Sequence, residues 1–224
     1  MSEGGSPRIL VTGFGSFPGV HLNPTAALIE SLRVEPPALP RGGKLFFDVL
    51  DVEYRSLPAR LEMLGREAQP DIAIHFGVSG RATGFTIERR AQNRVCTQRP
   101  DQSGIVPAEA AIRQGYADCS SSLPIERLVQ ALEEHGLPAS LSDDAGDYLC
   151  NFLFFLSGGR HCSGFSPDMT GFVHVPAFGA ALADGRAFDL SLLRRGAEVI
   201  IAAWADHWLE QRAQMKKAAP EGTA

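Results

Sequence analysis

The sequence predicts a single α/β domain of three layers, with helices on both faces of a central mixed, mostly parallel sheet. Short apolar runs rich in β-branched residues alternate with amphipathic stretches along the chain. Two of these runs end in glycine-rich loops, as strands of α/β sheets do. The 224 residues fit one medium domain, and no internal repeat or second hydrophobic core is evident.

The first half of the chain is predicted to supply three strands and two helices. The strands are apolar runs at residues 8–12, 44–54 and 71–76. Asn23 and Pro24 are residue types that favour the N-cap and the first position of a helix, so a helix is expected to begin there. Residues 56–68 are expected to form the second helix, because leucine recurs at helical spacing. Glycine-rich loops follow the first strand at 13–19 and the third at 77–80. In such sheets, loops at the carboxyl ends of strands carry the binding site.

The second half continues the alternation. Further strands are expected at residues 85–91, 139–142 and 171–176. Further helices are expected at residues 125–135, from an N-cap at Asp147 into the apolar run 152–156, and at 189–215. Residues 94–108 are predicted to form a long polar loop. We expect the folded domain to span residues 8–215, with flexible tails at 1–7 and 216–224.

Composition argues against several classes of function. The net charge is −5, and no Lys/Arg cluster interleaves with aromatic residues, which disfavours nucleic acid or an anionic membrane as partner. The start lacks the features of a secretory signal, and no apolar run is long enough to cross a bilayer. Four widely spaced cysteines without a Cys-x-x-Cys pair indicate neither a disulfide framework nor a metal site. We therefore expect a cytoplasmic protein without a metal.

Cys150 is the first candidate for chemistry. It is expected in the first turn of an apolar helix, where backbone N–H groups lack partners and the dipole is positive. Such positions favour the thiolate, which is the nucleophilic form of cysteine. Asp143, Asp144 and Asp147 act in the opposite sense, because a like charge disfavours a thiolate. The alternative is an inert cysteine that fills the core.

A nucleophilic cysteine needs a base, and the base needs an orienting group. His174 lies in an apolar strand late in the chain, and Glu88 lies in a half-apolar strand beside Arg89 and Arg90. Each has a structural alternative: His174 as a core histidine bonded to backbone, and Glu88 as an acid paired with arginine.

Four segments together resemble the pyroglutamyl peptidase I family, also called pyrrolidone-carboxylate peptidases. The resemblance runs from about Ile9 to the C-terminal helix, and the order Glu, Cys, His matches that family. The matching segments are Gly-Phe-Gly-Ser-Phe at 13–17 with Asn23-Pro24, Ile-Glu-Arg-Arg-Ala-x-Asn at 87–93, Ala-Gly-x-Tyr-x-Cys-Asn at 145–151, and Gly-Phe-Val-His-Val-Pro at 171–176.

The resemblance implies a cytosolic cysteine exopeptidase that removes an N-terminal pyroglutamyl residue from peptides, without a cofactor. It implies Cys150 as nucleophile, His174 as general base and then acid, and Glu88 as the residue that orients the imidazole. It also implies an α/β fold with a central mixed sheet, and a homo-oligomer, often a tetramer. The residues that match the family's pocket for the lactam ring are Phe14, Phe17, Tyr148 and Leu149.

The chain departs from the family's pattern at the second glycine loop. The family commonly has Gly-Gln-Ala-Gly-Gly there, whereas this chain has Gly-Val-Ser-Gly-Arg at 77–81. Val78 thus replaces a Gln that could help to hold the substrate, and Leu-Asp-Val at 50–52 replaces the family's Leu-Pro-Thr or Leu-Pro-Val.

Three alternatives stay open. They are a cysteine hydrolase of another cyclic or small amide, a catalytically silent binding protein on the same scaffold, and a nucleotide-binding protein. The glycine spacing of the first loop and its lack of a basic residue disfavour the last.

Overall fold

A six-stranded sheet with the order β2-β1-β3-β8-β4-β7 forms the centre of the computed structural model, which describes residues 5–17, 22–182 and 184–218. All neighbouring strands are parallel except β4 and β8, so the predicted mixed, mostly parallel sheet is confirmed. The strands are β1 (Arg8–Phe14), β2 (Lys44–Leu50), β3 (Ile72–Val78), β4 (Phe85–Glu88), β7 (Ala139–Ser142) and β8 (Met169–Val175).

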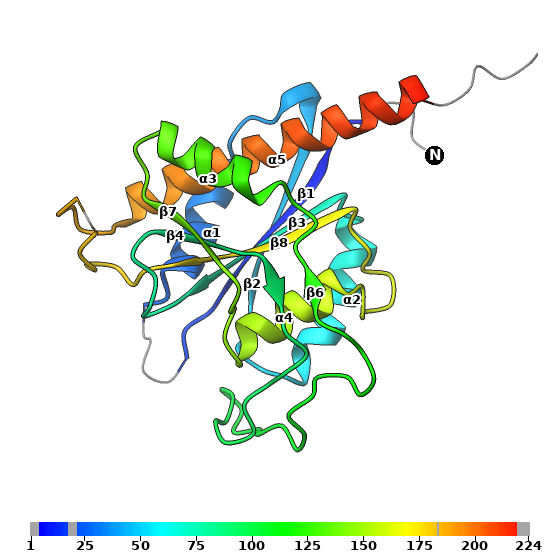
Figure 1. Ribbon diagram of the computed structural model, residues 1–224, viewed down its shortest axis with the longest axis vertical. Helices are drawn as coiled ribbons and strands as arrows, with labels where there is room; N and C mark the ends of the chain where they lie inside the picture. Colours follow the sequence, from blue (N-terminus) through cyan, green and yellow to red (C-terminus); the bar gives the residue numbers. More distant parts are fainter. Residues whose placement is uncertain (1–4, 18–21, 183, 219–224) are drawn as a thin grey trace, which may run out of the picture.

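Helices cover both faces of this sheet, which confirms the three layers (Figure 1). On one face lie α1 (Pro24–Val34), α3 (Ile125–Glu134) and α5 (Leu190–Ala218), and on the other α2 (Ser56–Ala68) and α4 (Leu149–Gly158). A short 3-10 helix, η1 (Pro40–Gly42), precedes β2.

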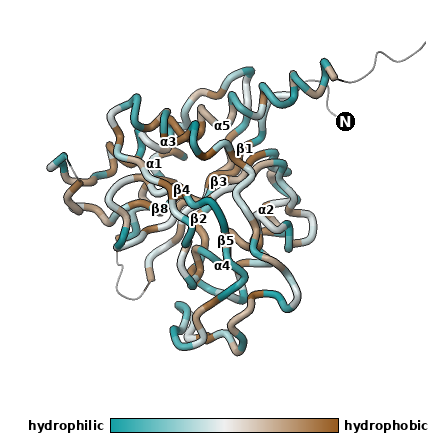
Figure 2. The backbone as a smooth tube through the Cα atoms, in the orientation of Figure 1, coloured by the Kyte–Doolittle hydropathy of each residue, from teal (hydrophilic) through white to brown (hydrophobic). Residues whose placement is uncertain are grey.

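The core consists of two hydrophobic clusters, one on each side of the sheet. Side chains alternate along a strand, so Ile74 and Phe76 of β3 pack with α1 and α5, whereas Ala73 packs toward α2 and α4. Because both faces are covered, β1, β3 and β8 are buried almost throughout, which explains their continuous apolar runs. Figure 2 shows these hydrophobic segments at the centre of the molecule.

The start of α1 holds the first glycine loop in place. Asn23 Oδ1 accepts a hydrogen bond from the Thr25 N–H at 3.0 Å, as expected of an N-cap, and Asn23 Nδ2 donates to the Gly15 carbonyl at 3.0 Å. A Cβ at Gly13 would lie 2.6 Å from the Thr25 carbonyl oxygen, so helix and strand approach closely there. These contacts fix the end of β1, which carries Phe14, and the loop after it, which carries Phe17.

Two strand predictions need correction. The second strand ends at Leu50 rather than at residue 54, and an irregular segment follows in which Val52 and Tyr54 are still buried. The apolar pattern there reflects packing, not extended pairing. Residues 85–91 form two elements, because β5 (Arg90–Ala91) leaves the main sheet and pairs with β6 (Cys119–Ser120). A two-residue strand such as β6 is too short to leave a periodic pattern.

The long loop is longer than predicted. Residues 92–118, all of which the structure describes, contain no helix or strand.

Helix α5 extends to Ala218, beyond the predicted end of that helix at residue 215. Near the other end, the Lys44 N–H donates to the carbonyl of buried Pro7 at 2.8 Å. The flexible tails stay a prediction, because residues 1–4 and 219–224 lie outside the described ranges, as does Gly19 of the first loop. Of the helices described, none combines the length and apolar character needed to span a bilayer.

Candidate active site

The two glycine loops, the start of α4 and the end of β8 meet around a cavity of about 540 Å³. This confirms that the loops at the strand ends converge. Cys150 and His174 both line the cavity, and Glu88 lies next to His174 in the strand beside β8. The five residues expected to bind substrate also line it: Phe14, Phe17, Val78, Tyr148 and Leu149.

Cys150 is the second residue of α4. The first hydrogen bond of the helix joins the Phe152 N–H to the Tyr148 carbonyl at 2.9 Å. The N–H groups of Leu149 and Cys150 therefore belong to the free, electropositive end of the helix. Tyr148 is the N-cap and its side chain makes no capping bond, so the prediction of Asp147 as N-cap is wrong. The Asp147 carboxylate instead faces Arg99, with 3.7 Å between Oδ1 and Nη2.

His174 and Glu88 form a buried pair. Nδ1 of His174 lies 2.7 Å from Oε1 of Glu88, across the antiparallel neighbours β8 and β4. Because Glu88 occupies Nδ1, Nε2 is the ring nitrogen that is left to interact with Cys150. The side chains that were predicted to act together are thus in contact, in the order Cys150, His174, Glu88.

The charge of His174 is set by these two partners. Burial disfavours the charged ring, but the interactions with Cys150 and with Glu88 outweigh it and raise the pKa of His174 to about 9. The ring is therefore an imidazolium at neutral pH. An imidazolium between a carboxylate and a sulfur is the arrangement that keeps a cysteine ready for nucleophilic attack.

Neither structural alternative for Glu88 and His174 holds. The neighbouring arginines turn to Asp143 instead of Glu88: Arg89 Nη1 lies 2.9 Å from the Asp143 carboxylate, and Arg90 donates to the Asp143 carbonyl at 3.2 Å. Asp101, another carboxylate of the cavity wall, accepts hydrogen bonds from the backbone N–H groups of Tyr54, Ser103 and Ile105. It therefore holds its loop and does not contact the imidazole.

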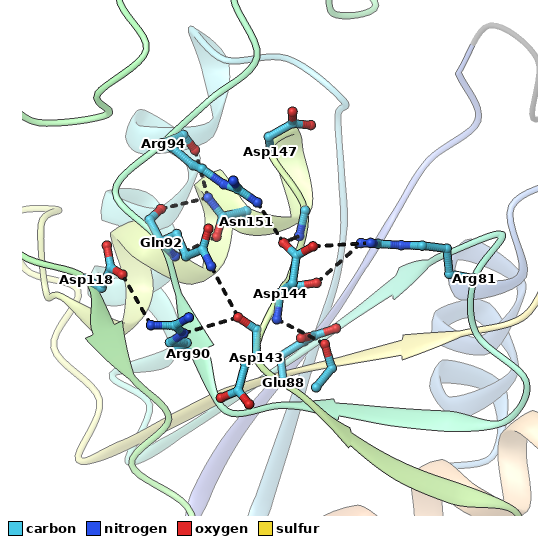
Figure 3. Close-up of polar contacts among 12 residues, drawn as sticks. Arg81, Glu88, Arg90, Gln92, Arg94, Asp118, Asp143, Asp144, Asp147 and Asn151 are labelled. Atoms are coloured by element: carbon cyan, nitrogen blue, oxygen red, sulfur yellow. Dashed lines mark hydrogen bonds and ion pairs between the residues drawn. The ribbon is translucent and has the colours of Figure 1, made fainter.

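The aspartates around Cys150 pair with arginines from other segments. Figure 3 shows the two partners of Asp144. Asp144 lies 3.2 Å from Arg81, which follows β3, and 2.9 Å from Arg94, which follows β5. Asp143 pairs with Arg89 and Asp147 with Arg99. Exposed pairs such as these stabilise the fold little. Their effect is on charge, because they offset the repulsion that the sequence predicts between these aspartates and a thiolate.

Asn151 is a structural residue of the site that sequence reasoning assigned no role. It is fully buried, and its Oδ1 accepts from the Gln92 N–H at 2.8 Å. Its Nδ2 donates to the carbonyls of Gln92 at 2.7 Å and Arg94 at 2.8 Å (Figure 3). Asn151 thereby fastens the segment after Glu88 to the helix that carries Cys150. The Cys-Asn dipeptide of the motif was the available signal.

The cavity wall contains charged residues besides the aromatic and apolar residues that match the family's pocket. Tyr148 packs edge-on against Tyr54, with 5.9 Å between ring centroids, and its hydroxyl donates to the Pro100 carbonyl at 2.8 Å. The Arg99 guanidinium lies over the Tyr148 ring, 3.7 Å from its centroid. Aromatic and apolar residues form the expected part of the wall, and the charged residues that complete it are Arg81, Arg99, Asp101 and Asp147.

The remaining cysteines differ from Cys150. Burial raises the pKa of Cys119 and of Cys162 to about 11, so both stay thiols at neutral pH. Within residues 5–17, 22–182 and 184–218, no group of three or more His, Cys, Asp or Glu side chains is placed to hold a metal ion.

Comparison with known proteins agrees with this geometry. The sequence model of the family described as pyroglutamyl peptidase matches residues 7–203. The pyrrolidone-carboxylate peptidase of Pyrococcus furiosus is 36% identical over 171 residues, which are 75% of this chain and 80% of the relative. That of Streptococcus pyogenes is 32% identical over 217 residues, covering 94% and 97% of the two chains.

Solved structures show the same likeness. A point variant of pyrrolidone carboxyl peptidase from Pyrococcus furiosus superposes with a TM-score of 0.79 at 31% identity, over 89% of this chain and 99% of the other. The enzyme from Thermococcus litoralis gives a TM-score of 0.80 at 25% identity, over 92% and 96%. With a family match over most of its length and relatives of this identity and coverage, the chain belongs to the pyroglutamyl peptidase family.

Proposed function

We propose that this protein is a cysteine exopeptidase that hydrolyses the amide bond after an N-terminal pyroglutamyl residue. Cys150 is the nucleophile, His174 the general base and then acid, and Glu88 the residue that orients the imidazole. The observation that carries the proposal is the position of His174 between Glu88 and Cys150, in which both partners favour the imidazolium.

The proposed reaction has two halves. His174 takes the proton of Cys150, and the resulting thiolate attacks the pyroglutamyl carbonyl carbon. N–H groups at the start of α4, with those of residues 77–80, donate hydrogen bonds to the developing oxyanion. The imidazolium of His174 gives its Nε2 proton to the leaving amine as the C–N bond breaks, which leaves a thioester on Cys150. Neutral His174 then takes a proton from water, the hydroxide attacks the thioester, and pyroglutamate leaves as the C–S bond breaks.

The cavity suits a small, flat, neutral ring. Phe14, Phe17 and Tyr148 offer aromatic surface, against which a lactam can lie with little loss of hydration. The lactam N–H and C=O need hydrogen-bond partners, which backbone groups of the two glycine loops can supply. Val78 lines the cavity without a polar side chain, and this favours a second candidate: a cysteine hydrolase of another cyclic or small amide.

The assay that tests the proposal uses a fluorogenic pyroglutamyl amide with the wild type and Cys150→Ala. We expect the wild type to release the fluorophore and the variant to release none. Rapid alkylation of Cys150 without turnover would favour the second candidate. A Cys150 that alkylates no faster than Cys96, Cys119 and Cys162 would indicate a silent binding protein.

Family resemblance also supports a homo-oligomer, which we propose to be a tetramer, and a cytoplasmic location. Light scattering on the purified protein and fractionation of the cells that produce it would test these two points.

A further inference from the structure

We infer that Gly77 is a positioning residue for the reaction, because the sulfur of Cys150 occupies the space that a side chain at position 77 would fill. A Cβ built at Gly77 would lie 2.8 Å from Cys150 Sγ and 2.7 Å from Cζ of Phe172. Both distances are far inside van der Waals contact. The inference rests on the proposed role of Cys150 as nucleophile.

The register of the sheet shows why this space matters. Gly77 of β3 and His174 of β8 are paired residues in neighbouring parallel strands, which lie about 4.8 Å apart. Ala73 and Phe172 point toward α4, and side chains alternate along a strand, so positions 77 and 174 also face α4. A sulfur above Gly77 is therefore beside the imidazole of His174. Because position 77 has no side chain, the Cys150 sulfur can lie close to the sheet, level with His174.

A methyl group at position 77 has a defined way to be accommodated. The atoms it meets are the tips of two side chains, Cys150 and Phe172, and no backbone atom lies among its three nearest contacts. Rotation of the cysteine side chain relieves the contact with the sulfur, and the buried ring of Phe172 has to shift as well. We therefore expect Gly77→Ala to fold and to carry its sulfur away from His174.

Kinetics should reveal this displacement. For Gly77→Ala we expect kcat to fall about 100-fold, because a displacement of about 1 Å in a reacting group has effects of this size. KM should change less than threefold, because Phe14, Phe17 and Tyr148 are untouched. The rate of Cys150 alkylation by iodoacetamide at neutral pH should fall as well, because the contact with His174 is weakened.

Gly171→Ala is the matched control. Gly171 lies on β8, and a Cβ there would lie 2.3 Å from Leu123 Cδ1 and 3.0 Å from Trp204, in the core on the side of α3 and α5. This variant crowds the other face of the same sheet. We expect lower thermal stability with kcat within twofold of wild type. An equal loss of kcat in both glycine variants would overturn the inference, because crowding of the sheet would then explain it.

A double-mutant cycle based on the free energy of unfolding tests position 77 without relying on catalytic activity. The free energy of unfolding is measured for wild type, Gly77→Ala, Cys150→Ala and the double variant. We expect Gly77→Ala to cost less stability when the sulfur is absent, because the contact with Phe172 remains and the contact with Cys150 Sγ does not. Equal costs in both backgrounds, or a Gly77→Ala enzyme with wild-type kcat, would overturn the inference. Failure of the wild type to cleave pyroglutamyl substrates would instead refute the proposed function, and the cycle would still test position 77.

Discussion

Nδ1 of His174 lies 2.7 Å from Oε1 of Glu88, and the pair is buried between strands that run in opposite directions. Orientation of the ring is thus built into the sheet. The other carboxylate oxygen, Oε2, has no hydrogen-bond partner among the residues that the structure describes. The hydrogen bond of the Glu88 carboxylate is thus directed at the imidazole of His174, and the pH dependence of the reaction can test its effect.

Glu88→Gln should slow hydrolysis less than His174→Ala, because it leaves the base in place. The raised pKa of His174, about 9, predicts that kcat/KM of the wild type falls above this pH as the imidazolium loses the proton for the leaving amine. In Glu88→Gln the imidazolium loses the stabilisation that the carboxylate provides. The fall of kcat/KM on the alkaline side of the pH profile (the alkaline limb) should therefore move to lower pH. The measurement is kcat/KM against pH for all three proteins.

Asp101→Asn is the control for this experiment. Its carboxylate is bound by backbone N–H groups of its own loop and of Tyr54, so the substitution should lower stability and leave the alkaline limb in place. A Glu88→Gln enzyme with wild-type activity and an unchanged limb would remove Glu88 from the site. If Asp101→Asn moved the limb instead, Asp101 would take its place as the acid.

Cys150 should react with iodoacetamide before any other cysteine at about pH 7.5. Cys150 lines the cavity beside His174, whereas burial raises the pKa of Cys119 and Cys162 to about 11. Peptide mapping by mass spectrometry after brief labelling measures the order in which the cysteines react.

Cys150→Ala should remove activity but keep the unfolding temperature within a few degrees, because the side chain is small. More than trace hydrolysis by this variant would show that the nucleophile is wrongly assigned.

Local signals explain which parts of the fold were predictable. β1, β3 and β8 are covered on both faces and so read as apolar runs, and the cap of α1 is a contact between near neighbours, Asn23 and Thr25. The β5–β6 pair was missed because it forms where two distant loops meet, and each strand has two residues. Val52 is buried although it lies in an irregular segment, so its apolar side chain suggested a strand that the backbone does not form.

The site was predictable as a set of residues but not as a geometry. The pairing of Asp144 with Arg81 and Arg94 joins three segments that are far apart in sequence. Asp147 was predicted as the cap of α4 because the sequence gives no sign of Arg99, which draws its carboxylate away. Gly77 looked like any loop glycine, and the need for it is evident only where Cys150 is placed above it.

His75 should make the stability of this protein depend on pH. Burial lowers the pKa of His75 to about 3, and its ring is bonded to Thr12 and Ser157 at 2.8 and 2.9 Å. Below about pH 6.5 the unfolded chain takes up a proton at this residue and the native chain does not, so stability falls as pH falls toward 3. At pH 5 this loss is on the order of 2 kcal/mol.

Urea unfolding of wild type, His75→Gln and Thr12→Val at pH 7 and pH 5 tests this. The Gln variant has no titrating ring, so its difference between the two pH values should be smaller than that of wild type. Thr12→Val removes a hydrogen bond but keeps the ring, so it should lose stability by similar amounts at both pH values. If wild type and His75→Gln showed the same pH difference, the ring would not be the source of the effect.

Selectivity should favour pyroglutamyl over glutamyl substrates. A pyroglutamyl ring is neutral and can lie against Phe14, Phe17 and Tyr148, whereas an N-terminal glutamate brings an ammonium and a carboxylate. Burying either without a partner costs several kcal/mol. Two charged residues of the wall, Arg99 and Asp147, lie 3.7 Å apart and face each other, and Arg99 also stacks on Tyr148. We expect kcat/KM for glutamyl amides to be lower by roughly 100-fold or more.

Val78→Gln tests the polar contacts of the same cavity. Valine offers no hydrogen bond to the lactam, so a glutamine at this position should lower KM for the pyroglutamyl amide and leave kcat within a few-fold. A side-by-side assay of pyroglutamyl, glutamyl and prolyl amides with both proteins gives the comparison. The prolyl ring lacks the carbonyl and carries a protonated amine, so it shows the combined value of the lactam carbonyl and of a neutral ring. Comparable rates on the glutamyl amide would refute the cavity as a lactam site. An unchanged KM in Val78→Gln would show that position 78 does not contact the ring, and the backbone of the glycine loops would then carry the recognition.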